Sequence, residues 1–417
     1  MCEGKSSKAK GIGSSINYFA SSGAFDLTTS NFLNKNILNQ LPSYQQHLQK
    51  YLNQKQILTL EILVWLLQAH KQVTIERLAA FLPLPILYES RRKHLQRFLI
   101  LRNFSVALIW LPIVKIFISN NFKKGSRILV IIDGTKWHNN HLLMVSVRYK
   151  NRAIPIYWQF LDKIGSSNLS EQIAVLRPVL KLLKSYPIVV VGDREFRGVK
   201  LAYWLKTKGV KFALRVQGNT HVKWDGYPEQ KISTLGCLPG MKKFYSHVNY
   251  TKKKGFGTFN LAAYWKRKYG GKTEQQPWYI LTNLDTFDEV IKAYRGRSSI
   301  EAMFRDCKSG GYNLSCSKAS EQRSSRLVLL IALAYISSVL MGTKLKYQGL
   351  QKYISRLSEP RRVVKRHSNF WVGFYGQSWV FSLEYCQPLV TQLMSLSPHK
   401  LPHYQRGLRA MSLIKST

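Results

Sequence analysis

Acidic side chains are scarce in this 417-residue chain, and their scarcity limits what the protein binds. Asp and Glu together number 21 against 63 Lys and Arg, which gives a formal net charge of +42 and an isoelectric point near 10.2. Solubility needs far less charge, and an uncompensated surplus would repel itself in the folded chain. We therefore expect a polyanionic partner, and we favour nucleic acid over a membrane surface.

Cysteine is also rare. The five cysteines are odd in number and include no Cys-x-x-Cys pair, so neither a disulfide framework nor a zinc ribbon is predicted. His138 and His141 have a ligand-like spacing, but no second pair follows, so we interpret them as exposed loop histidines. The compartment is expected to be reducing, and the chain to be cytoplasmic and associated with the nucleoid.

No apolar run is long enough to cross a bilayer. The longest, Leu327–Met341, has about 15 residues, whereas a spanning helix needs roughly 20. Arg323, Arg326 and Lys344 flank it. We therefore predict a buried core helix and no membrane partner. Residues 1–24 mix Lys, Gly and Ser and lack the apolar centre of a signal peptide.

Two apolar segments each end in an aspartate. Residues 128–132 are five consecutive apolar residues followed by Asp133 and Gly134, and Pro187–Gly192 ends in the same way at Asp193. Such runs predict strands that are buried on both faces. A carboxylate at that position is costly unless it has a partner. Each aspartate alone could simply cap the next loop.

A third carboxylate lies in Tyr294–Lys308, the stretch around which we expect the chain to be organised. On a helix of about 100° per residue, five side chains fall within a sector of roughly 80°: Tyr294, Arg297, Glu301, Arg305 and Lys308. If Gly296 breaks this helix, a start at Ser298 still leaves Glu301 and Lys308 two turns apart on one side. The alternative is a capping box of Ser298 and Glu301 on a solvated face. Three converging carboxylates favour a site for divalent cations.

The pattern Tyr294-x2-Arg297-x3-Glu301-x6-Lys308 resembles the signature of bacterial insertion-sequence transposases of the Asp-Asp-Glu type. Asp133–Thr135 is similar to the first-aspartate motif of that family, and Gly192–Phe196 to the second. The resemblance covers roughly residues 127 to 340. It implies an enzyme that binds the ends of an insertion sequence and catalyses DNA cleavage and strand transfer into target DNA.

The resemblance also implies roles for individual residues. Asp133, Asp193 and Glu301 would hold two Mg²⁺ ions, with Mn²⁺ as a substitute, about 3.5 to 4 Å apart. Arg297 and Lys308 would clamp phosphates, Arg297 in bidentate fashion, with Tyr294 donating or stacking beside them. Arg194 and Lys136 are weaker candidates for the same role. The partners implied are transposon-end DNA and target DNA, and a homodimer is expected in the DNA complex.

The order of predicted elements indicates the fold class. With 45% hydrophobic residues the chain should fold. A strand at 128–133, a hairpin of 141–149 and 153–160, and then alternating helices and strands to 216 give the order βββαβαβ. Followed by the helix that bears Glu301, this order predicts an α/β, ribonuclease-H-like catalytic domain, a mixed sheet with helices on both faces. Neighbouring strands would then bring the carboxylates together.

Other segments flank or interrupt this domain. Helices at 57–70, 74–82 and 91–101, the last capped by Ser90, predict either a helix-turn-helix reader of DNA or a simple helical cap. Gly218–Pro277 carries 11 Lys and Arg against 3 Asp and Glu, a net of +8, with scattered aromatic residues. It predicts a β-rich insertion that either tracks DNA or buries its own rings.

The predicted divisions are an arm at 1–50, a helical domain at 51–122, a catalytic domain at 123–217 plus 278–345, the insertion at 218–277 and a basic, aromatic C-terminal region at 346–417. Two functional alternatives stay open besides the membrane surface. A ribonuclease-H-like, structure-specific nuclease would use the same carboxylates but would need no reader of terminal sequences. A catalytically inactive DNA-binding relic would have lost one of the acids, yet all three are present.

Overall fold

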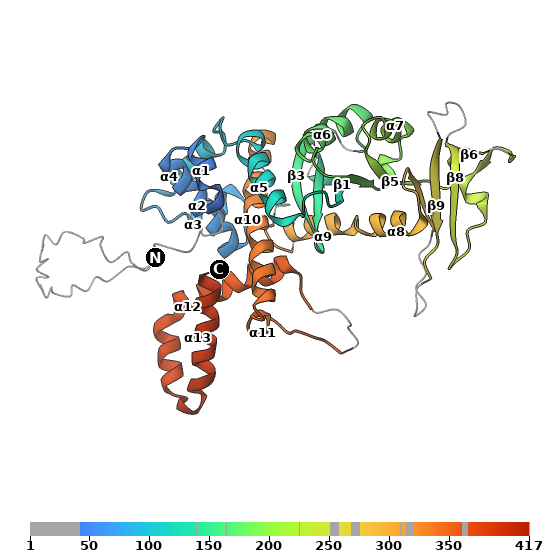
Figure 1. Cartoon of the computed structure of the whole chain (residues 1–417). Coiled ribbons are helices and arrows are strands. Elements are labelled where there is room, and N and C mark those ends of the chain that lie inside the picture. Colours follow the sequence, from blue (N-terminus) through green and yellow to red (C-terminus); the bar gives the residue numbers. More distant parts are fainter. Residues whose placement is uncertain are drawn as a thin grey trace, which may run out of the picture. The chain divides into compact units, whose positions relative to one another are not determined.

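A ten-stranded mixed sheet organises the fold (Figure 1). The structure is a computed structural model and describes residues 42–137, 140–163, 165–224, 226–250, 258–267, 276–308, 310–313, 320–360 and 366–416. All of these residues belong to one compact unit. Residues 1–41 of the arm predicted at 1–50, and His138, lie outside the described residues. The predicted domain boundaries stay predictions.

The strands follow the order β3-β2-β1-β4-β5-β10-β9-β8-β6-β7 across the sheet. β1 is antiparallel to β2 and parallel to β4, and β4 is parallel to β5. The bounds are β1 Ile128–Trp137, β2 Asn140–Tyr149, β3 Arg152–Leu161, β4 Ile188–Gly192, β5 Lys211–Val216 and β10 Trp278–Thr282. The predicted hairpin is present, and so is the predicted order of elements along the chain, βββαβαβ. Ile132 of β1 pairs with Gly192 of β4. Asp133 and Asp193, the next residue of each segment, therefore lie side by side at the carboxyl ends of these parallel strands, the edge of the sheet that holds the site.

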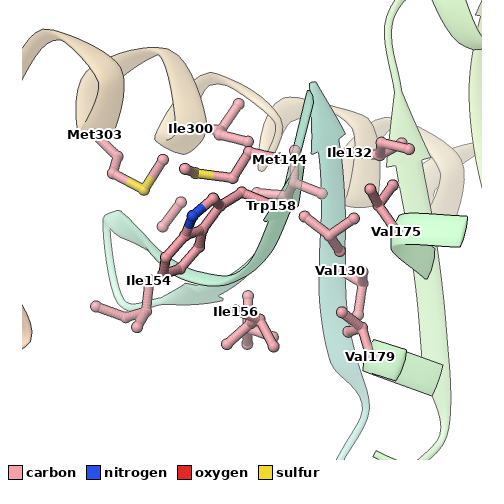
Figure 2. Close-up of a cluster of buried hydrophobic side chains, with 14 of the residues drawn as sticks. Val130, Ile132, Met144, Ile154, Ile156, Trp158, Val175, Val179, Ile300 and Met303 are labelled. Carbon is pink, nitrogen blue, oxygen red and sulfur yellow. The ribbon is translucent and has the colours of Figure 1, made fainter. Parts of the chain in front are cut away.

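Helices cover both faces of the sheet beside β1. In Figure 2, Val130 and Ile132 of β1 lie toward α6 (Leu169–Leu182), whereas Met144 of β2 and Trp158 of β3 lie toward α9 (Ser298–Cys307). The first group joins Val130 and Ile132 to Val175 and Val179, and the second joins Met144 and Trp158 to Ile300 and Met303. These residues are buried. Strand residues alternate between faces, so Asp133, the register partner of Met144, belongs to the α9 face.

The predicted insertion is rich in strands and extends the same sheet. β9 pairs with β10, and β8 pairs with β9. The bounds are β6 His221–Lys223, β7 Gln230–Lys231, β8 Lys242–Tyr250 and β9 Thr258–Tyr264. Some of its aromatic rings are core, since Tyr250 and Phe259 are each 2% exposed. Tyr227 is 56% exposed and packs beside Trp224.

The N-terminal part of the described chain is helical. Its helices are α1 Pro42–Gln49, α2 Gln54–His70, α3 Ile75–Phe81, α4 Tyr88–Phe98 and α5 Leu111–Asn121, with a π-helical turn at Val106–Trp110. The three predicted helices exist, but Ser90 lies inside α4, so its prediction as an N-cap was wrong. The loose structure predicted up to residue 50 was also wrong over α1, because Tyr44 and Leu48 anchor it in the core.

The predicted core helix is the centre of α10, Glu321–Tyr347. α10 is long and apolar enough to cross a membrane, but 83% of its apolar window is buried inside the protein. It packs against α2 and α12 (Asn369–Ser395). At the α10–α12 crossing a Cβ on Gly373 would lie 1.9 Å from the Ser338 carbonyl oxygen, so glycine permits the close approach. The remaining helices are α7 Val199–Thr207, α8 Phe287–Arg295, α11 Gln351–Ile354 and α13 Leu401–Lys415.

Candidate active site

The two aspartates occupy adjacent strand ends. Asp133 is 8% exposed, and its Oδ1 accepts a hydrogen bond from the backbone N–H of Gly134 at 2.9 Å. Asp193 directly follows β4 and begins a short 3₁₀ turn, where its Oδ1 accepts from the backbone N–H of Glu195 at 2.9 Å. Each carboxylate is therefore held by a main-chain donor close to it in sequence. Both were predicted at this edge of the sheet.

Arg297 joins the third carboxylate to the first. It lies in the short break between α8 and α9, and its Nη1 is 3.2 Å from Asp133 Oδ2. Its Nη2 donates to Glu301 Oε1. The Arg297 side chain is 17% exposed, whereas that of Glu301 is 49% exposed. Two carboxylates that are distant in sequence thus share one guanidinium.

The capping box weighed for this helix is not present. Within the described residues no side chain caps the N-terminus of α9. The Ser298 hydroxyl instead donates to the backbone carbonyl of Arg295. Glu301 is directed to Arg297, so its position is explained by the site rather than by the helix end.

The charges of the three carboxylates interact. The pKa of Asp133 is raised to about 7, first by burial and then by the neighbouring carboxylates of Asp193 and Glu301, against the opposing effects of Arg297 and the Gly134 N–H. Burial disfavours the ionised form, and nearby like charges do the same. Asp193 and Glu301 are therefore each close enough to Asp133 to disfavour its ionised form, and Arg297 only partly compensates.

The donor set has the chemistry that magnesium requires. All three acids supply carboxylate oxygens, which are the ligands of hard divalent cations. Within the described part of the chain, no group of three or more His, Cys, Asp or Glu side chains is already arranged around a metal position. Arg297 takes up oxygens of Asp133 and Glu301. The acids supply the oxygen ligands that a divalent cation requires, and their negative charges favour a bound cation. Here the guanidinium of Arg297 supplies the positive charge that the cation would bring.

The other predicted contact residues have partners in different segments of the chain. Lys308 Nζ donates to Thr135 Oγ1 at 2.6 Å and to the Lys136 carbonyl at 3.1 Å, so it is fixed to β1. The Lys136 side chain is exposed. Arg194 donates to Gln276 Oε1 at 2.6 Å. Lys308 thus belongs to the carboxylate edge, whereas Arg194 is directed to the segment before β10.

Tyr294 does not share the exposed face predicted for it. It is 3% exposed, and its ring packs edge-to-face on Trp278 with centroids 5.0 Å apart. Burial raises the pKa of its hydroxyl, although Arg297 and Arg215 oppose this. The reason is the break at Gly296, which separates α8 from α9 and changes the helical phase. Tyr294 supports Arg297, whose guanidinium carbon is 5.9 Å from the ring centroid.

Three residues near the aspartates were not predicted. Glu195 Oε1 accepts hydrogen bonds from the backbone N–H and the hydroxyl of Ser167 at 2.7 and 2.5 Å. His141 Nε2 lies 3.6 Å from the same oxygen. The prediction of His141 as an exposed loop residue was wrong, since it lies in β2 and its side chain is 12% exposed. Glu195 was visible as part of the Gly192–Phe196 motif, but its long-range partners were not.

Part of the chain is similar to a known protein family. Residues 156–337 match the family model described as the transposase DDE domain. The matched span contains Asp193 and Glu301, begins after Asp133 and covers less than half of the chain. No curated protein matches. Among solved structures, a cryo-EM structure of a piggyBac transposase synaptic complex with hairpin DNA is similar at 15% identity and a TM-score of 0.41, covering 78% of this chain and 71% of that chain.

Proposed function

We propose that the protein is a DNA transposase of the Asp-Asp-Glu type that cleaves the ends of an insertion sequence and joins them to target DNA by cut-and-paste transposition. The observation that carries the proposal is the gathering of Asp133, Asp193 and Glu301 at one edge of the sheet, with Arg297 bound to two of them. The family match over residues 156–337 supports the same class.

The proposed cofactor is a pair of Mg²⁺ ions held by Asp133, Asp193 and Glu301, with Mn²⁺ as a substitute. Such ions would supply charge neutralisation at the reacting phosphate and a more acidic bound water. The protein itself contributes position: main-chain donors orient the two aspartates, and α9 presents Glu301 from the facing layer. Little covalent chemistry is needed from side chains in phosphoryl transfer, because positioning and electrostatics dominate.

Arg297 has two roles in this proposal. Without metal it balances Asp133 and Glu301. Bound cations would take over that role, and the guanidinium would then be available to bind a phosphate through two parallel N–H donors. Lys308 is proposed to hold the β1 edge and a neighbouring phosphate, and Tyr294 to support Arg297 from the core. Lys136 and Arg194 are proposed as outer DNA contacts.

DNA is the proposed partner, both as transposon ends and as target. The net charge of +42 supports a polyanion. A cavity of about 530 Å³ at the opposite end of β4 supports it further, because its lining includes four cations and no acid: Arg177, Lys181, Lys184 and Lys208, beside Trp204. The strand order 3-2-1-4-5 supports a ribonuclease-H-like catalytic domain. A helical DNA-binding domain at 51–122, a homodimer in the DNA complex and a cytoplasmic, nucleoid-associated location remain part of the proposal.

A structure-specific nuclease with the same carboxylates is the second candidate, favoured by the same geometry. Cleavage assays separate the two. Duplex DNA that carries the inverted repeats flanking the coding region should be nicked at the repeat ends in Mg²⁺ and joined to a target plasmid. Equal cleavage of branched DNA without those repeats, and no joining, would replace the transposase by the nuclease. An inactive DNA-binding protein would give neither product.

A further inference from the structure

A compact polar cluster lies behind the two aspartates. It consists of Glu195, His141 and Ser167, and the side chains of His141 and Glu195 are 12% and 16% exposed. Gln172 extends it, since its Nε2 donates to the Ser167 carbonyl at 3.1 Å. Glu195 Oε1 accepts hydrogen bonds from the backbone N–H and the hydroxyl of Ser167. His141 Nε2 lies 3.6 Å from the same oxygen.

The cluster occupies the opposite face of the sheet from the three acids. His141 pairs with Lys136 in the β1–β2 register, whereas Asp133 pairs with Met144. Because side chains alternate along a strand, His141 lies on the α6 face and Asp133 on the α9 face. Ser167, just before α6, agrees with this assignment. The cluster therefore reaches the acids only through the backbone.

That backbone contact is close. A Cβ on Gly134 would lie 2.1 Å from His141 Nε2 and 3.3 Å from Glu195 Oε2. The imidazole thus lies directly against the main chain of the residue that follows Asp133, and it is Gly134 whose N–H donates to the Asp133 carboxylate. On the other side, the N–H of Glu195 donates to Asp193. One residue, Glu195, therefore holds Asp193 through its backbone and His141 through its side chain.

We infer that Glu195 and His141 are positioning residues that fix the separation of Asp133 and Asp193 from the reverse face, so that both carboxylates are placed for one divalent cation. This inference rests on the proposed function and assigns a role toward its metal site. Residues that orient metal ligands without touching the metal typically change affinity by about 10- to 100-fold. Neither side chain contacts DNA or the cation in this assignment.

The test measures Mn²⁺ uptake by the full chain without DNA, from the electron paramagnetic resonance signal of free Mn²⁺ at a temperature where every variant is folded. Glu195→Ala and His141→Ala should each raise the Mn²⁺ concentration for half-saturation about 10-fold. The double variant should need no more Mn²⁺ for half-saturation than the more affected single variant, because the two side chains act as one unit. His141→Gln should recover most of the affinity, since its amide can donate to Glu195.

A matched control exists within the chain. His221 and Glu229 form the same kind of pair in the insertion, with Nδ1 and Oε1 3.1 Å apart and partly exposed side chains. Variants His221→Ala and Glu229→Ala should leave Mn²⁺ half-saturation unchanged. If His141→Ala does not fold, Glu195→Gln, which keeps size and removes charge, decides the test.

The outcomes are distinct. Cluster variants that melt at a lower temperature but bind Mn²⁺ as the wild type does would show that Glu195 and His141 only stabilise the fold. That result would overturn the inference. A tenfold loss in the cluster variants with unchanged controls supports it. A wild type that takes up no Mn²⁺ overturns the proposed function together with this inference, whereas wild-type uptake that is lost only in Asp193→Asn overturns the inference alone.

Discussion

Helix α9 carries two acidic residues that both pair with arginine, yet their surroundings differ sharply. Glu301 is half exposed and shares Arg297 with Asp133. Asp306, near the other end of the helix, has a 13% exposed side chain 2.7 Å from Arg152 Nε, and Tyr335 donates to it at 3.4 Å. One arginine–carboxylate pair faces the site, and the other faces the core.

The difference shows how pairing alone does not define function. Burial raises the pKa of Asp306 to about 6, despite the opposing effect of Arg152. A buried ion pair offsets little of its desolvation cost, and breaking it is more costly than replacing it whole. Glu301 retains access to solvent, so its carboxylate can exchange Arg297 for a cation. The Asp306–Arg152 pair is therefore expected to affect folding, and the Glu301–Arg297 pair to affect chemistry.

The largest effect is expected at the acids of the site. Asp193→Asn and Glu301→Gln should each lower DNA nicking by at least about 10³-fold, because a ligand of the proposed cations is lost. DNA affinity in a gel-shift assay and the free energy of unfolding in urea should stay close to wild type. A Glu301→Gln variant that nicks DNA at the wild-type rate would contradict the catalytic role assigned to Glu301.

Asp306→Ala should give the reverse pattern. Arg152 would be left partly buried without its partner, so the free energy of unfolding should fall by on the order of 3 kcal/mol. Nicking at 20 °C should change little while the protein is folded. The double variant Arg152→Met with Asp306→Leu should recover most of the stability. If it does not, the pair is not the structural element described.

Stability should also depend on pH through Asp306. Its pKa is raised from 3.8 to about 6 in the folded state, so the folded chain holds the proton more tightly. The stabilisation is present at low pH and is lost as pH rises through 6. Between pH 4 and 7 the wild type should lose about 2 kcal/mol relative to Asp306→Asn. Parallel urea-unfolding curves of both proteins measure this, and equal pH slopes would contradict it.

The smallest expected effect is at Lys308, which joins the end of α9 to β1. Lys308→Met removes a charge-assisted hydrogen bond to Thr135 worth about 1.5 to 3 kcal/mol, so nicking should fall about 10- to 100-fold. Lys308→Arg should restore part of it. A loss as large as that of Glu301→Gln would mean that Lys308 acts on the reacting phosphate more directly than the structure indicates.

Much of this site could be read from the sequence because its determinants are local. Apolar runs that end in Asp133 and Asp193 identified two buried strands, and helical spacing identified Glu301, Arg297 and Lys308 as one group. Tyr294 was misplaced because packing decides the helix break: a Cβ on Gly296 would lie 2.2 Å from Leu129 Cδ2. The periodicity of one helix carries no information about this contact between Gly296 and the sheet.

What could not be predicted depends on contacts between distant segments. Nothing in the local sequence distinguishes His141 from an ordinary loop residue. In the structure it lies in β2 against Gly134, with Glu195 beside it. In the same way, nothing local indicates that the insertion continues the central sheet through β9 and β10. The pairing of Arg152 with Asp306 is a third example, because both residues read as ordinary surface charges in the sequence.

The central claim is that Asp133, Asp193 and Glu301 gather around divalent cations. Anomalous diffraction from crystals of the protein bound to a terminal DNA duplex and soaked in Mn²⁺ tests it most directly. Manganese peaks within coordination distance of all three carboxylates, with Arg297 moved toward a DNA phosphate, are predicted. Peaks that omit any of the three, or Arg297 still bound to Asp133 and Glu301 beside a metal elsewhere, would contradict the account.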